Sequence, residues 1–442
     1  MVEYPPIEIE EKTLVIPNEG TPADEIWLSN LDLLVARAHT PTVYFYRRPL
    51  GASDFFSPTV LKDALARTLV PFYPLAGRLV SGADGRLCIR CTAEGALFIV
   101  ARSVSVLRDF GDFAPSDQIR HLLVPFSDIA NEGNQPLVMF QLTFFQCGGV
   151  CLGAAVHHTA ADGLGALNFI NSWASIARIT NHNLIPQSFN RTSLRSRSPP
   201  SITSTHYEYS HTQPTSSTRH SPFTSIVLRL SNHHLSILRT TTTLSKKPLS
   251  TFKAVVAHIW RCACKARGLD SAQLTRLYMT ADARSRLHPP LPPNFIGNAI
   301  FRVSTELTAG EVVAENLEFT AAKVSAATTR LDNEYVRSLV DFLEARVEDI
   351  AVRKGSWVMP ETDIWVISWQ GLPIYEADFG WGKPLFMGRA CLQFSGLLYI
   401  VPTSPEEEEG GLLVLAAIEP EKVERFKEVF YKELGHPVSA NL

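Results

Sequence analysis

A β-strand pattern runs directly into a helix pattern near the middle of this sequence. Residues 150–158 form an apolar run typical of a buried strand, and residues 137–145 form another, joined to it by a Gly-containing turn. From residue 163 onward, apolar side chains recur at helical spacing, at Leu164, Leu167, Ile170, Ala174 and Ala177. Asp162 stands just before this helix, where a carboxylate caps the free N–H groups. The pattern predicts a hairpin whose second strand delivers His157 and His158 to its end, beside the start of a helix.

The chain length and one shift in composition predict two domains. At 442 residues the chain exceeds the size at which a single hydrophobic core stops growing. Residues 181–225 are rich in Ser, Thr, Pro, Arg and His and poor in apolar residues, as in a surface crossover. We therefore expect an N-terminal domain over residues 1–180, a linker over 181–225 with solvated histidines such as His206, and a C-terminal domain over 226–442. Strands and helices mix without a regular repeat, which indicates a mixed α/β fold.

Charge and composition exclude several classes of function. The net charge of −3 and the absence of a basic run argue against a nucleic-acid partner. No apolar run is long enough to cross a membrane, and the first residues lack a secretory signal pattern, which favours a cytoplasmic protein. The seven cysteines form no disulfide framework, and the single CxxC at residues 88–91 has no second pair. We expect no metal site.

Two adjacent histidines end the second strand of this predicted hairpin. Alternation along a strand sends His157 and His158 to opposite faces, so only one of them can face a cleft. His158 precedes Asp162 by four residues, and a histidine with a pKa near neutrality can act as a general base. The residues alone equally allow a buried structural histidine that bonds to Asp162.

Other chemistries fit this stretch less well. Zinc hydrolysis would need a motif such as HExxH, and serine hydrolysis would need an elbow such as GxSxG, and neither is present. Cys151 lies on the same strand as His158, but seven strand residues span more than about 20 Å, so the pair cannot meet in a straight strand. The remaining chemistry is direct transfer of a group to an acceptor, with His158 removing the proton of that acceptor.

Two motifs together carry a family resemblance. Residues 158–163 (HTAADG) match the HxxxDG motif of the plant BAHD acyltransferases, and residues 378–382 match their DFGWG motif. The second motif comprises Asp378, Phe379, Gly380, Trp381 and Gly382. Residues 39–46, 69–78, 109–115 and 291–298 resemble the branch that transfers hydroxycinnamoyl groups from CoA to shikimate or quinate.

The resemblance implies a fold and a set of roles. It implies two domains like chloramphenicol acetyltransferase with a channel between them, acting as a monomer on acyl-CoA and a small acceptor, with no permanently bound cofactor. His158 would deprotonate the acceptor, while Asp162 would turn away and pair with Arg284, supported by Gly163. DFGWG would shape the CoA side of the channel without taking part in the chemistry.

The strand at residues 40–46 carries hydroxyls on one face, at Thr40, Thr42, Tyr44 and Tyr46. The pattern alone favours a solvent face. The resemblance reverses that interpretation, because Thr40, Thr42 and Tyr44 would line the acyl pocket and contact the phenol of the acyl group.

One departure from the branch concerns the acceptor. Where the branch has an arginine that binds the acceptor carboxylate, this chain has Gly371, two residues after Trp369. Loss of a bidentate Arg–carboxylate contact disfavours shikimate and quinate. Because Glu361 and Glu376 lie nearby in the sequence, we expect a polyamine or aryl amine acceptor. The alternatives are a shikimate or quinate acyltransferase, a member that binds CoA esters without catalysis, and an acyl-CoA hydrolase.

Overall fold

The computed structural model describes residues 4–126, 134–178, 186–209, 221–244, 247–346 and 359–435. The chain forms two compact units that do not follow the simple order of the sequence. Unit 1 comprises residues 1–197, 289–299 and 372–391, and unit 2 comprises residues 198–288, 300–371 and 392–442. Each unit is a mixed sheet with packed helices, in agreement with the predicted fold class.

Unit 1 is built on a sheet with β8 near its centre. The strand order is β1 (Glu8–Val15), β6 (Ala96–Ser103), β7 (Val138–Phe145), β8 (Val150–His157), β3 (His39–Tyr46) and β15 (Phe386–Arg389). Every residue of β8 is buried, as its apolar run predicts for a strand covered on both faces. The predicted hairpin is confirmed, because β7 and β8 pair in antiparallel register.

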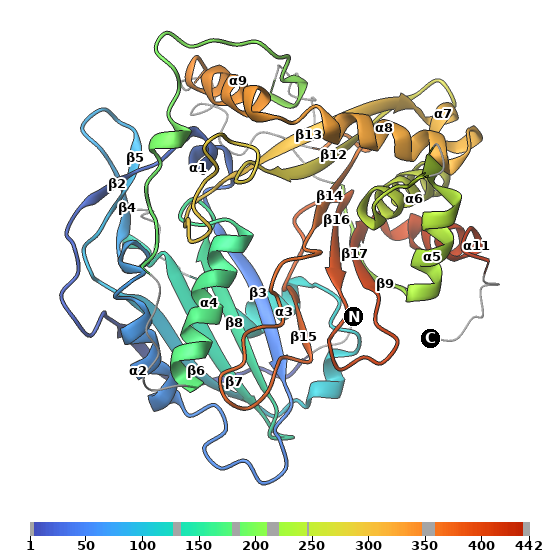
Figure 1. The fold of residues 1–442 in the computed structure, drawn as a ribbon. Coiled ribbons are helices and arrows are strands. Elements are labelled where there is room, and N and C mark those ends of the chain that lie inside the picture. The colour runs from blue at the N-terminus through green and yellow to red at the C-terminus, as the bar shows by residue number, and fades with distance from the viewer. Residues whose placement is uncertain are drawn as a thin grey trace. The chain divides into compact units, whose positions relative to one another are not determined.

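Helix α4 (Gly163–Arg178) covers one face of this sheet (Figure 1). Trp173 anchors the helix: its ring lies 4.7 Å from that of Phe140 on β7, and its Nε1 donates to the Leu61 carbonyl of α2 (Pro58–Thr68) at 2.9 Å. The predicted helix start beside Asp162 is confirmed. The first residue of α4, Gly163, therefore follows the end of β8 by six residues.

The remaining elements of unit 1 complete its edges. A small sheet has the order β2 (Glu25–Trp27), β5 (Leu87–Arg90) and β4 (Arg78–Ser81). The short helices are α1 (Asn30–Leu34), α3 (Asp117–Leu123), η1 (Tyr73–Ala76), η2 (Leu107–Phe110) and η4 (Thr192–Leu194).

The structure divides the chain differently from the predicted domains. The prediction assigned DFGWG to the C-terminal domain, whereas residues 372–391 belong to unit 1. The physical reason is strand pairing: β15 is antiparallel to β3, with Phe386 opposite Phe45 and Arg389 opposite Thr42. A strand this short carries no sequence signal that names its partner.

Unit 2 is a second mixed sheet with helices. Its strand order is β13 (Ile300–Thr308), β12 (Leu274–Asp282), β14 (Ile364–Ser368), β16 (Leu397–Pro402), β17 (Leu412–Ile418) and β9 (Thr224–Leu230). A short ribbon pairs β10 (Thr243–Leu244) with β11 (Lys247–Pro248). The helices are α5 (Asn232–Thr241), α6 (Thr251–Arg267), α7 (Ala309–Ala314), α8 (Leu317–Thr329), α9 (Asn333–Glu344), α11 (Val423–Lys432), η5 (Tyr207–Tyr209) and η6 (Pro420–Lys422).

The predicted linker is partly packed. Unit 2 begins at Ser198, and the following residues lie against α9, where Ser338 Oγ accepts from Thr203 N at 3.0 Å. The expectation of a solvated His206 is wrong: its side chain is buried and its Nε2 lies 3.0 Å from the same Ser338 Oγ. Composition misled here because this polar segment bonds to a helix instead of water. Residues 179–185 and 210–220 of the linker region lie outside the described residues.

Within the described ranges, the structure has no helix long and apolar enough to cross a membrane.

Candidate active site

Strand pairing fixes where the two histidines emerge. His157 is the last residue of β8 and lies opposite His39 of β3, and the main-chain N of His158 donates to the Ala38 carbonyl at 3.0 Å. Carried one residue past the strand, the alternation directs His158 to the face of Thr40 and Thr42 and His157 to the opposite face. The predicted separation of the two side chains therefore follows from the register.

His157 is a buried packing residue. Its side chain is 6% exposed and its ring meets that of His39 edge to face at 5.0 Å. Burial lowers the pKa of His157 to about 3, and the neighbouring His39, His158 and Arg37 act in the same direction. The ring is neutral at physiological pH, and its Nδ1 accepts from Thr159 N at 3.3 Å.

His158 is only partly covered, although its Nδ1 is buried. Burial lowers the pKa of His158 below its usual 6.5. Its own main-chain carbonyl, Asp162 and the Asn298 side chain oppose this shift, whereas Arg389 on β15 adds to it. A histidine with a lowered pKa is neutral at pH 7, which is the protonation state that a general base needs.

Asp162 is occupied by main-chain donors. Its Oδ1 accepts from Gly165 N and its Oδ2 from Ala299 N, both at 3.0 Å, and the carboxylate is 1% exposed. The first bond is the predicted cap of α4, which begins at the exposed Gly163. The second bond joins the motif to residues 289–299. Both bonds suit a carboxylate that holds the loop in place.

The predicted pairing of Asp162 with Arg284 stays a prediction. Arg284 belongs to unit 2, where its main-chain N donates to Asp282 Oδ1 at 2.7 Å and its Nη1 lies 3.5 Å from the same oxygen.

Three polar residues near His158 escaped the sequence analysis. Asn298 donates from Nδ2 to the main-chain oxygen of His158 at 2.7 Å and to Asp32 Oδ1 at 3.2 Å. Asp32 also accepts from Arg191 Nε at 2.9 Å. The capping pattern of Ser29 to Asp32 was a usable signal for α1. Nothing in the sequence signals that α1 meets residues 191 and 298.

The hydroxyl-bearing face of β3 is packed, so the solvent-face interpretation is wrong. Thr42 lies opposite Ala154, which lies opposite Phe140, so this face is the one that α4 covers. Thr42 Oγ1 donates to the Ala154 carbonyl at 3.4 Å. The Tyr44 hydroxyl is buried with no hydrogen-bond partner among the described residues, and burial raises its pKa above the usual 10. Thr40 is half-buried.

The DFGWG loop is anchored in unit 1. Asp378 Oδ1 accepts from Gly380 N at 2.8 Å and Gly382 N at 3.0 Å, and both glycines have φ of +104°, which favours glycine. The Phe379 ring packs 4.9 Å from that of Trp173 on α4. Trp381 packs on Phe56, with ring centroids 5.2 Å apart. Through these contacts, the motif packs residues 372–391 against α4 and the sheet face that α4 covers.

Comparison with known proteins identifies the family. A sequence model of the Transferase family matches residues 5–433. The chain is 55% identical to the Putrescine hydroxycinnamoyltransferase 1 of Oryza sativa subsp. japonica, in an alignment covering 97% of this chain and 99% of that one. The chain belongs to the plant BAHD acyltransferases. It is therefore an enzyme that transfers acyl groups other than aminoacyl groups.

Two further similarities bear on this BAHD acyltransferase. It is 40% identical to the Shikimate O-hydroxycinnamoyltransferase of Nicotiana tabacum, covering 96% of this chain and 99% of that one. The crystal structure of Vinorine Synthase has the same fold, with a TM-score of 0.75 and 21% identity over 96% of this chain and 98% of that one.

Gly371, where this chain departs from the shikimate branch of BAHD acyltransferases, has free space around it. Gly371 has φ of +83°, and a Cβ built there would meet nothing within 4 Å. Nearby Trp369 is buried, with its ring 5.2 Å from that of Tyr399. Of the two nearby glutamates, Glu376 belongs to unit 1 and pairs with Lys383 at 2.8 Å, whereas Glu361 belongs to unit 2 and bonds to Ser221.

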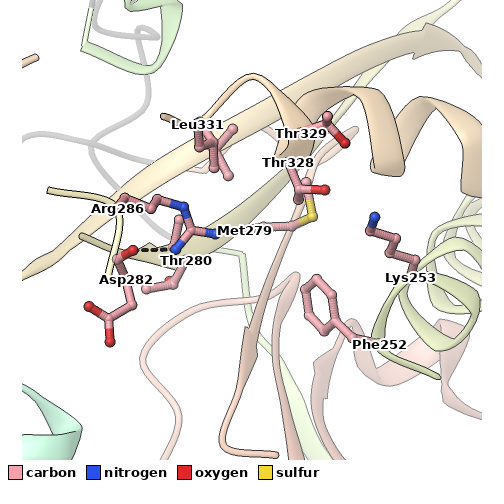
Figure 2. Close-up of a pocket in the computed structure, with 11 residues that line it drawn as sticks. Phe252, Lys253, Met279, Thr280, Asp282, Arg286, Thr328, Thr329 and Leu331 are labelled. Carbon is pink, nitrogen blue, oxygen red and sulfur yellow. Dashed lines mark hydrogen bonds between the residues drawn. The ribbon is translucent and has the colours of Figure 1, made fainter. Parts of the chain in front are cut away.

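Unit 2 of this BAHD acyltransferase contains a cavity of about 440 Å³ (Figure 2). Arg286 lies on one side of Met279, and Lys253 with Phe252 lies on the other. Arg286 donates to the Asp282 carbonyl, and Lys253 donates to Ser325 Oγ at 2.9 Å. Lys253 and Arg286 give the lining two cations against the one carboxylate of Asp282, and this excess of positive charge suits an anionic ligand.

Groups suited to a nucleophile or a metal lie elsewhere. Cys151 is fully buried, and burial raises the pKa of its thiol well above 9, which disfavours a thiolate nucleophile. Among the described residues, a metal-sized cluster consists of His258, Cys262 and Glu433 in unit 2. His258 Nε2 lies 3.1 Å from the Phe430 carbonyl, and Glu433 pairs with Lys265. Protein groups thus already bond to two members of this cluster.

Proposed function

We propose that this BAHD acyltransferase transfers a hydroxycinnamoyl group from a CoA thioester to the amino group of a polyamine or aryl amine. The observation that carries the proposal is the 55% identity, over nearly the whole of both chains, to a protein named for acyl transfer to putrescine. The open glycine at position 371 points the same way, because glycine has no side chain with which to bind an acceptor carboxylate. Shikimate or quinate is the alternative acceptor, supported by the 40% identical relative.

His158 is the proposed general base. The neutral amine attacks the thioester carbonyl, a C–N bond forms, and the imidazole takes the N–H proton that the product cannot keep. Collapse of the tetrahedral intermediate breaks the C–S bond, and the CoA thiolate leaves with the proton that His158 returns. The lowered pKa of His158 suits this role because the ring enters each cycle neutral.

Acyl-CoA is the proposed co-substrate and is released after each turnover. The cavity with Lys253 and Arg286 would hold its phosphates, since ammonium and guanidinium groups bind phosphate oxygens through charge-assisted hydrogen bonds. In unit 1, the buried Tyr44 hydroxyl has no partner among the described residues, and the phenol of a coumaroyl or caffeoyl group would supply one. Thr40 and Thr42 lie on the same strand face.

The deciding experiment is an acceptor competition. Coumaroyl-CoA would be supplied with putrescine, spermidine, tyramine, shikimate, quinate and a simple alcohol in one mixture, and products quantified by mass spectrometry. We expect amides to dominate and kcat/KM to be highest for an amine. A higher kcat/KM for shikimate or quinate would contradict the proposed acceptor class.

Two controls address the remaining alternatives. A reaction without acceptor measures release of free CoA, and release as fast as in the full mixture would indicate a hydrolase. His158→Ala should reduce turnover by roughly 100- to 10,000-fold, the usual contribution of a general base, while acyl-CoA still binds. Wild-type binding of acyl-CoA without turnover on any acceptor would indicate a non-catalytic member.

A further inference from the structure

Asp32 is a carboxylate buried at the junction of three chain segments of unit 1. Its side chain is fully buried, and a carboxylate can be stable there only if it is paired and hydrogen-bonded. Oδ2 accepts from Ser29 N at 2.8 Å, Ser29 Oγ at 2.7 Å and Arg191 Nε at 2.9 Å. Oδ1 accepts from Asn298 N at 2.7 Å and Asn298 Nδ2 at 3.2 Å. The network exceeds what capping the short helix α1 requires.

The contacts of Asn298 set the orientation of its amide. Its Nδ2 donates to Asp32 Oδ1, to the main-chain oxygen of His158 at 2.7 Å and, less closely, to that of Thr159 at 3.3 Å. An ionised carboxylate only accepts hydrogen bonds, so the nitrogen end of the amide must face Asp32. The oxygen of the same amide, Asn298 Oδ1, therefore points away from Asp32. It is buried and has no hydrogen-bond partner among the described residues.

The oxygen end of Asn298 and the ring of His158 each keep one buried polar atom. Among the described residues, neither Asn298 Oδ1 nor His158 Nδ1 has a hydrogen-bond partner, and the Asn298 side chain raises the pKa of His158, as an acceptor near the ring does. An acceptor beside Nδ1 keeps the proton there and leaves Nε2 as the nitrogen with a free lone pair. A flipped amide would place N–H groups against the ring and disfavour that tautomer.

We infer that Asp32 is a positioning residue for His158: by fixing the amide of Asn298, it holds the imidazole in the tautomer and orientation that accept a proton. The inference rests on the proposed role of His158 as the base. Arg191 Nε lies 2.9 Å from Asp32 Oδ2, so a guanidinium charge offsets the carboxylate inside this buried network. Neither Asp32 nor Arg191 needs to touch a substrate.

Several charged or titratable groups act on His158 besides this network. Asp162, before α4, raises its pKa, and Arg389 on β15 lowers it. His157 of β8 is also coupled to it. None of these groups changes in an Asp32 variant, so a shift in the acid limb of kcat/KM reports the loss of the Asp32 carboxylate and of the Asn298 contact that it fixes.

The test compares Asp32→Asn with wild-type enzyme on coumaroyl-CoA and the best amine. An amide at position 32 can donate to Asn298, so the Asn298 amide is free to turn. We expect kcat to fall on the order of 10- to 100-fold, the loss typical when a hydrogen-bond partner that orients a metal-ligating histidine is removed, with both KM values within about twofold of wild type. The acid limb of kcat/KM should move to lower pH, because the ring loses an acceptor and a nearby negative charge.

Two further variants separate positioning from folding. Asp32→Asn leaves Arg191 as a buried unpaired charge, so Asp32→Asn/Arg191→Gln removes both charges and should show the same limb shift in a better-folded protein. Ser29→Ala removes both contacts of the Ser29 hydroxyl with Asp32 but keeps the Asp32 charge and its bonds to Asn298, so it should lower the melting temperature while the acid limb stays in place.

Either of two outcomes would overturn the inference about Asp32. One is an acid limb that stays in place or moves to higher pH in both Asp32 variants, and the other is a loss confined to KM. Full turnover by His158→Ala would instead refute the proposed base, and with it any role for Asp32 through that residue.

Discussion

Asp162 Oδ2 accepts a hydrogen bond of 3.0 Å from the main-chain N of Ala299, a residue far along the chain that belongs to the same unit. With Oδ1 bonded to Gly165 N, the carboxylate ties the start of α4 to residues 297–299. The aspartate of the HxxxDG motif is thus a brace for the loop that carries His158.

The first prediction concerns this brace. Asp162→Asn sets an NH₂ group against one of two main-chain N–H donors, which should lower the free energy of unfolding by about 1–3 kcal/mol. Urea unfolding measures this loss, and kcat should fall less than in His158→Ala. Asp270→Asn is the matched control, because exposed Asp270 uses one oxygen to accept from Ala272 N and an amide oxygen can replace it. Equal unfolding midpoints for both variants would contradict the brace.

A second prediction follows from the low pKa of His157. Because that pKa is about 3, the unfolded chain binds a proton at this position near pH 6.5 that the folded chain refuses. This proton uptake destabilises the folded chain. The resulting loss in the free energy of unfolding is absent above pH 6.5 and grows by about 1.4 kcal/mol per pH unit as the pH falls toward 3. His157→Gln should therefore lose less stability than wild type between pH 7 and pH 5 in urea unfolding. A pH dependence of the stability of His157→Gln that is identical to that of wild type would rule out this prediction.

Tyr44→Phe tests the proposed contact with the phenol of the acyl group. The hydroxyl has no described protein partner, so its removal should leave the melting temperature unchanged or higher. The kcat/KM preference for coumaroyl-CoA over cinnamoyl-CoA should fall roughly 10-fold, about the value of one hydrogen bond to a ligand. Tyr46→Phe is the control: its hydroxyl donates to the Ala377 carbonyl at 2.8 Å, so that variant should lose stability and keep the preference. A preference unchanged in Tyr44→Phe would remove Tyr44 from the acyl site.

Gly371→Arg tests the basis of acceptor choice. A guanidinium at this open position should raise the kcat/KM ratio of shikimate to amine, because it supplies a carboxylate partner and repels a cation. The left-handed φ of +83° costs any side chain about 1–3 kcal/mol, so Gly371→Ala is measured beside it. If both variants change the kcat/KM ratio of shikimate to amine equally, the change comes from backbone strain and the predicted role of charge is wrong.

Lys253→Ala tests the phosphate site in the cavity of unit 2. We expect KM for acyl-CoA to rise roughly 10-fold, about 1.4 kcal/mol, with kcat unchanged. The matched donor is an acyl-pantetheine, which lacks the nucleotide phosphates, and the variant should use it as well as wild type does. A rise in KM of the same size for both donors would place Lys253 away from the phosphates.

Sequence patterns were sufficient where structure depends on neighbours along the chain. The run at residues 150–158 gave β8, the helical period after residue 163 gave α4, and Asp162 proved to cap that helix. They failed where partners are distant, since residues 372–391 were assigned to the wrong half and His206 was expected in solvent. Composition reports the average environment of a segment, not the element it packs against.

The sequence by itself determined the family, the order of the main elements and His158 as the residue to examine, because two specific motifs and short-range periodicity are written in consecutive residues. Only the tertiary structure decided how that histidine is held. The Asp32, Arg191 and Asn298 network depends on three segments meeting in one buried space, where unpaired polar groups are costly and each donor must find an acceptor. That requirement is met by three-dimensional proximity, which spacing along the chain does not encode.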